Sequence, residues 1–70
     1  MMPLTMAKMG EANSIKRIGG QPQTRQFLEN LGFVPGSPVT IVTKNGGNVI
    51  VNIKESRVAI SREMADKIMV

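Results

Sequence analysis

The chain has 70 residues, no cysteine and no histidine, and a formal net charge of +4 from nine basic and five acidic side chains. A chain of this length folds as one small domain, so we expect a single domain over residues 1–70. The missing cysteines and histidines exclude disulfides, zinc ribbons, Cys/His nucleophiles and haem attachment. The positive charge favours acidic partners, namely nucleic acid, an anionic membrane face or an acidic protein surface.

The first ten residues lean apolar, but Pro3, Lys8 and Gly10 interrupt them. This pattern lacks the continuous apolar run of a signal peptide, and nothing approaches the roughly 18 apolar residues of a membrane span. We therefore expect a loosely ordered lead-in, with Leu4 against the core, in a protein of the cytosol.

A first strand is predicted over Ala12–Ile18, which ends at Gly19–Gly20. Ile15 and Ile18 lie three residues apart, whereas residues on one face of a strand alternate with a period of two. A β-bulge would allow both isoleucines to point into the core.

A helix is predicted to begin at Pro22, because proline fits the first helical position. Its apolar stripe has helical spacing and comprises Thr24, Phe27, Leu28 and Leu31. Gly32 occupies the position after the helix where a left-handed residue is common, and Phe33 is then expected to pack back on Leu28.

The remainder of the chain is rich in valine and isoleucine and predicts short strands. Pro35–Gly36 suits a type II turn, and Asn45-Gly46-Gly47-Asn48 is typical of a β-hairpin. A second tight turn is expected at Glu55–Ser56, and Ser61 is expected to cap a brief helical turn. The predicted strands are Ser37–Lys44, Val49–Lys54, Arg57–Ile60 and Ile68–Val70. This order predicts a mainly β fold with short helices, a small barrel of about five strands with one helix packed across it.

No motif for a reaction accompanies this architecture. Glu63 and Asp66 lie three residues apart and could touch a divalent cation weakly, although helix capping and solvation explain them better. The two Gly-Gly pairs lack the spacing of phosphate-binding loops. The six methionines could bind a soft metal, but apolar packing is the simpler explanation. We expect no enzyme activity, no catalytic residue, no metal ligand and no evident cofactor.

A basic barrel is also typical of RNA-binding SH3-like modules. Those modules use aromatic platforms or dense arginine and lysine, whereas this chain has two phenylalanines and dispersed charges. We expect no nucleic-acid partner and keep an RNA-binding barrel as an alternative.

Two stretches resemble the ferrous iron transport protein A (FeoA) family. Arg25–Gly36 resembles the signature R-x-x-L-x-x-L-G-[F/L]-x-P-G, and Arg57–Val70 resembles the closing pattern of the family. The R-x-x-A-x-x-I-x-V ending is met by Arg62, Ala65, Ile68 and Val70. The resemblance covers essentially the whole chain and implies a single SH3-like barrel domain.

The resemblance also implies a function. Members of this family assist a membrane ferrous iron transporter, FeoB, which carries a cytoplasmic GTP-binding domain where the small protein is thought to dock. We therefore expect a cytoplasmic protein that reaches the inner face of the membrane only through this partner. Weak association with Fe²⁺ and an iron-responsive regulatory module remain alternatives.

The expected contact surface lies on the helix and at its exit. The residues assigned to partner binding are Arg25, Leu28, Leu31, Gly32, Phe33 and Pro35. Three of them, Leu28, Leu31 and Phe33, fit a core role at least as well. Arg25 is therefore the most specific residue of the prediction.

Overall fold

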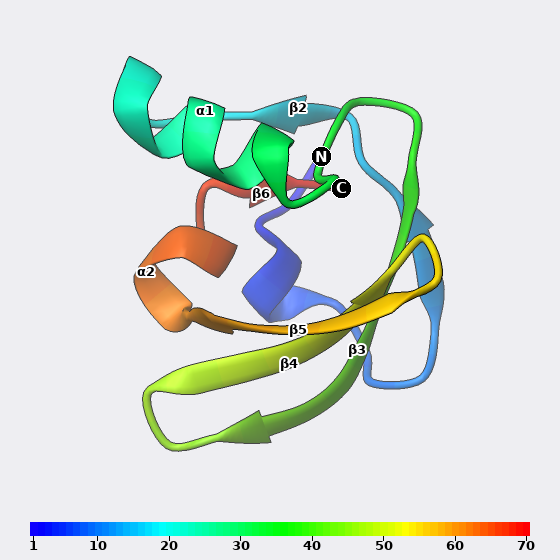
Figure 1. The fold of residues 1–70 in the computed structure, drawn as a ribbon. Helices are drawn as coiled ribbons and strands as arrows, with labels where there is room; N and C mark the ends of the chain where they lie inside the picture. The colour runs from blue at the N-terminus through cyan, green and yellow to red at the C-terminus, as the bar shows by residue number, and fades with distance from the viewer.

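The computed structural model describes residues 1–70 as six strands, two α-helices and one 3-10 turn, so the fold is mainly β with short helices (Figure 1). The elements are η1 (Leu4–Met6), β1 (Ala12–Ser14), β2 (Arg17–Ile18), α1 (Pro22–Asn30), β3 (Pro38–Asn45), β4 (Asn48–Ile53), β5 (Ser56–Ser61), α2 (Arg62–Ala65) and β6 (Ile68–Met69). They form an antiparallel four-stranded sheet in the order β1-β3-β4-β5 and a two-stranded sheet of β2 and β6. The strands therefore do not close into one continuous barrel.

The β3–β4 hairpin is the longest pairing of the larger sheet. Asn45 faces Asn48 across a two-residue loop, and Gly46 has a φ of 60° there, which confirms the predicted hairpin. The register shifts between Ile41 and Thr43, a bulge that the alternating pattern did not predict. Extra twist at a bulge lets a sheet curve around its core.

The turn between β4 and β5 lies one residue earlier than predicted. Ile53 pairs with Ser56, so Lys54 and Glu55 form the loop, and Ser56 already belongs to β5. Lys54 has a φ of 55° and is the only residue other than glycine with a positive φ.

The predicted first strand is split between the two sheets. The N–H of Ile15 donates to the carbonyl of Ser37 at 2.9 Å, whereas the N–H of Lys16 donates to the carbonyl of Met69 at 2.7 Å. The chain thus passes from one sheet to the other at Ile15–Lys16. Ile15 and Ile18 are both buried by this change of sheet, so the predicted bulge at this place is wrong.

The lead-in is tied down more firmly than predicted. Leu4 is completely buried, as expected, and Ala7 is buried as well. Met2 and Val70 exchange two backbone hydrogen bonds of 2.8 Å each. The N-terminal segment therefore lies along β6, on the edge opposite β2, and the two ends of the chain meet (Figure 1).

Helix α1 begins at Pro22, as predicted, and ends in a Schellman arrangement. The N–H of Gly32 donates to the carbonyl of Glu29 at 2.9 Å, and the N–H of Phe33 donates to the carbonyl of Leu28 at 3.0 Å. Leu28 is the one fully buried residue of the helix. Phe27 is 47% exposed, so its predicted place in the apolar stripe is wrong. The helix turns it toward solvent, about 100° away from Leu28.

The core consists of fifteen buried residues, all of them apolar, from both sheets, both helices and the lead-in. The larger sheet contributes Val39, Ile41, Val49, Val51, Ile53 and Ile60 to this core. Ser61 caps α2 as predicted, since its Oγ accepts from the N–H of Met64 at 3.2 Å. Neither α-helix has the length and hydropathy of a transmembrane segment.

Candidate functional site

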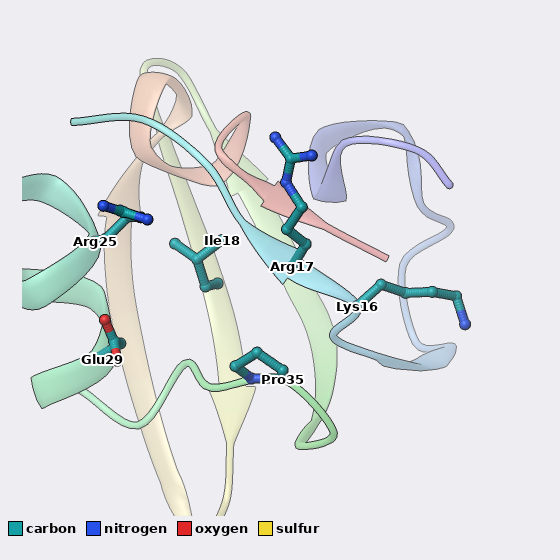
Figure 2. A pocket seen from close by; sticks show the side chains of 6 residues that line it. All are labelled: Lys16, Arg17, Ile18, Arg25, Glu29 and Pro35. Atoms are coloured by element: carbon teal, nitrogen blue, oxygen red, sulfur yellow. The ribbon is translucent and has the colours of Figure 1, made fainter. Parts of the chain in front are cut away.

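A hollow of about 220 Å³ lies between α1, β2 and the segment that follows α1. Its lining residues are Lys16, Arg17, Ile18, Arg25, Glu29 and Pro35. Figure 2 shows Arg25 reaching from α1 toward Ile18, with Pro35 at one end of the space. Lys16, which precedes β2, and Arg17, which belongs to β2, do not point toward the helix (Figure 2). The interior of the hollow therefore combines an apolar floor with one arginine and one carboxylate.

Three local structures position these residues. Pairing of β2 with β6 places Ile18 opposite Ile68. Arg25 and Glu29 lie one turn apart on α1, so both face the same side of the helix. Pro35 is held in place by its neighbour, because the N–H of Gly36 donates to the carbonyl of Ile15 at 2.8 Å.

The charge of the lining is mostly positive. Lys16, Arg17 and Arg25 contribute three cations, and Glu29 contributes the only carboxylate of the hollow. All four side chains are exposed. A concave surface of this charge attracts carboxylates and phosphates.

The structure divides the predicted partner-binding residues into two groups. Arg25 and Pro35 are exposed and line the hollow. Leu28 and Phe33 are completely buried, and Leu31 and Gly32 are half-buried. The buried residues Leu28 and Phe33 fix the C-terminal end of α1 in the core, and the position of the helix in turn determines where Arg25 lies.

Sequence reasoning did not assign Lys16, Arg17, Ile18 and Glu29 to a site. Helical spacing could have predicted Glu29 as a further residue of the site, since it lies one turn after Arg25. Lys16 and Arg17 belong to the lining because the short link through Gly19–Gly20 joins β2 to α1. That adjacency is visible in the sequence only once the short strand and the helix are both assigned.

The acidic side chains of the chain are dispersed. No group of three or more aspartate, glutamate, histidine or cysteine residues is placed to hold a metal ion. Within the predicted pair of Glu63 and Asp66, Asp66 is engaged elsewhere, because its Oδ1 accepts a hydrogen bond from Thr5 Oγ1.

A small, mainly β domain with a charged surface hollow is typical of binding modules. Residues 2–70 match the FeoA domain family, and the chain belongs to that family. The FeoA family comprises small accessory proteins of Fe²⁺ transport and is not an enzyme family. The resemblance found in the two sequence motifs is thereby confirmed.

Two known proteins match this chain over most of their own length. A protein of Methanocaldococcus jannaschii assigned as an Fe(2+) transport protein A is 39% identical over 70 residues, which cover 100% of this chain and 85% of that protein. The crystal structure of an iron uptake regulatory protein (FeoA) has a TM-score of 0.85 at 25% identity and covers 96% of this chain and 89% of that one.

The zinc complex of FeoA from Stenotrophomonas maltophilia, described as an SH3 domain protein, has a TM-score of 0.84 at 23% identity. The match covers 99% of this chain and 88% of that chain. This similarity extends to the fold, so the predicted SH3-like class is confirmed, with two sheets in place of a closed barrel.

Proposed function

We propose that this protein is a cytoplasmic accessory protein of ferrous iron uptake that docks on the cytoplasmic part of a FeoB-type membrane transporter. Membership of the FeoA family supports the role in Fe²⁺ transport. The docking surface is α1 together with the adjoining hollow, and the protein reaches the membrane through the transporter.

The exposed flanks of α1 are the observation that carries this proposal. Leu28 is the only fully buried residue of the helix, so most of the helix surface is exposed. Arg25 is exposed on the flank that lines the hollow. Phe27 is 47% exposed and lies on the opposite flank, about 160° away around the helix axis.

Arginine and aromatic residues are enriched at the energetic centres of protein interfaces. Phe27 is one of four large apolar side chains that remain exposed, and the others, Met1, Met6 and Met9, belong to the lead-in. An exposed phenylalanine on one flank of α1 and an exposed arginine on the other both suit a helix that a partner covers.

The test is binding of the purified protein to the cytoplasmic part of a FeoB-type transporter, together with Fe²⁺ uptake by cells. The variants Arg25→Glu and Phe27→Ser change exposed side chains, so both are expected to fold. Each is expected to weaken binding about tenfold or more and to reduce Fe²⁺ uptake.

Arg62→Glu is the matched control, because it makes the same charge change at an exposed position that starts α2. It is expected to bind like the wild type. If Arg25→Glu and Phe27→Ser also fold, bind and support uptake like the wild type, α1 is not the docking surface.

A further inference from the structure

The basic side chains fall into two sets by what they bind within the protein. Lys44 Nζ donates to the carbonyl of Thr5 at 2.9 Å, and Arg57 Nε donates to Asn52 Oδ1 at 3.3 Å. The other seven basic residues donate none of the side-chain hydrogen bonds of the structure, and four of them are the exposed residues Lys16, Arg17, Arg25 and Lys67. These four cations are therefore available to an external anion.

Lys16 and Arg17 precede the link between β2 and α1, Arg25 follows it, and Lys67 lies beside it. A Cβ at Gly19 would lie 4.0 Å from Arg17 Nη2, and a Cβ at Gly20 would lie 3.5 Å from the aliphatic stem of Lys67. The side chains of Arg17 and Lys67 thus both lie next to Gly19–Gly20. Arg25 stands on the first turns of the helix that follows, and Lys16 precedes Arg17 on the chain. We call these four residues the basic arc.

The hollow beside the basic arc has an apolar floor and a small volume. Ile18 and Pro35 supply its apolar atoms. Its volume of about 220 Å³ is smaller than the roughly 300–1,000 Å³ typical of sites for metabolites and drugs. A space of this size suits one side chain of a larger partner.

We infer that the hollow and the basic arc bind an acidic, extended segment of a protein partner. An apolar side chain of this segment enters the hollow over Ile18 and Pro35. Carboxylates before and after it pair with Arg25 on one side and with Arg17 and Lys67 on the other, as charge-assisted hydrogen bonds. The inference rests on the proposed function and states the chemistry of the transporter segment that docks.

Two observations favour an acidic polypeptide over a nucleic acid or a lipid surface. Stacking of unpaired bases needs an exposed aromatic ring, but Phe33 is buried and Phe27 lies outside the lining. A concave site with an apolar floor also matches a protruding side chain better than it matches a flat bilayer.

The test is fluorescence anisotropy of the full chain with a fluorescein-labelled peptide, Asp-Glu-Leu-Asp-Glu. Binding is expected to weaken as ionic strength rises from about 50 to about 300 mM, because exposed charges are screened. Replacing the acidic residues of the peptide by Asn and Gln, or its Leu by Gly, is expected to weaken binding about tenfold. The double variant Arg17→Glu/Lys67→Glu is expected to weaken it by about tenfold or more.

The control is Lys8→Glu/Arg62→Glu, which makes the same change of charge at exposed positions outside the basic arc. Thermal unfolding of each variant shows that it is folded. The inference is overturned if the acidic peptide does not bind, if the control weakens binding as much as the arc variant, or if single-stranded RNA or vesicles containing phosphatidylglycerol bind with higher affinity than the peptide.

Binding to the transporter separates this inference from the proposed function. If the transporter part binds the wild type and the arc variant equally, the docking proposal stands and the acidic-segment inference fails. If the peptide binds as described but the transporter part does not bind, the acidic-segment site stands and its assignment to the transporter fails.

Discussion

The backbone N–H of Phe33 donates to the carbonyl of Leu28 at 3.0 Å, and both side chains are completely buried. This pair joins the last turns of α1 to the segment that leads to Pro35 and β3. Because Arg25 and Glu29 lie on α1 and Pro35 follows it, the shape of the hollow depends on this junction. The buried residues of the FeoA signature therefore act on the site through the position of the helix.

Leu28→Ala is expected to lower the free energy of unfolding by about 2–5 kcal/mol, because it leaves a cavity under α1. A domain of this size has a net stability of roughly 3–5 kcal/mol, so a large fraction of the variant is expected to be unfolded at room temperature. Urea unfolding followed by circular dichroism measures this loss. Arg25→Ala, which alters an exposed side chain of the same helix, is expected to stay within about 0.5 kcal/mol of the wild type.

Gly32→Ala is expected to be more destabilising than Gly46→Ala by about 1 kcal/mol or more. Gly32 has a φ of 106° and Gly46 a φ of 60°, and only the latter lies within the left-handed region open to other residues. Steric crowding does not explain the expected difference in stability, since a Cβ at Gly32 would lie 3.7 Å from Lys54 Cδ, an ordinary contact distance. Equal unfolding midpoints for the two variants would contradict this explanation.

Lys54→Gly is expected to raise the free energy of unfolding by roughly 0.5 kcal/mol. Lys54 has a φ of 55°, which costs a residue with a Cβ about 1–2 kcal/mol, and the greater freedom of glycine in the unfolded chain offsets part of the relief. Lys54→Val is expected to lower stability by about 1 kcal/mol, because a β-branched residue tolerates positive φ poorly. Thermal unfolding tests both variants: Lys54→Gly is expected to melt at a higher temperature than the wild type, and Lys54→Val at a lower one. A lower melting temperature for Lys54→Gly would show that this turn is unstrained.

Leu4→Ala is expected to cost about 2–4 kcal/mol of unfolding free energy, because Leu4 is completely buried. Met6→Ala, in the same 3-10 turn but 70% exposed, is expected to change stability by about 0.5 kcal/mol or less. Chemical unfolding of both variants compares them directly. A loose lead-in, as the sequence predicted, would make the two effects similar and small.

Local sequence patterns were sufficient to predict helix α1 and the hairpin between β3 and β4. Pro22 and Gly32 bound α1 correctly, and Gly46–Gly47 marked the hairpin between β3 and β4. The change of sheet at Ile15–Lys16 was not predictable in this way. It depends on hydrogen bonds to Ser37 and Met69, which lie far along the chain and carry no local pattern.

The candidate site was also only partly predictable, because it too depends on contacts between residues that are far apart in the sequence. The FeoA signature directed attention to α1, and Arg25 and Pro35 do line the hollow. Phe27 was placed in the apolar stripe because helical spacing allows a broad stripe, but α1 buries only Leu28 fully. Lys67 lies beside the β2–α1 link because the N–H of Gly19 donates to its carbonyl at 2.7 Å, and these two residues are far apart in the sequence.

The two backbone hydrogen bonds between Met2 and Val70 place the chain ends side by side (Figure 1). Domains with adjacent ends tolerate circular permutation and insertion into a loop of another protein. Joining the ends by a short glycine linker and opening the chain at Gly46–Gly47 would retain both sheets and leave α1 and the hollow intact. The fold could thus be built into a host protein as a compact insert, with α1 and the hollow turned away from the point of attachment.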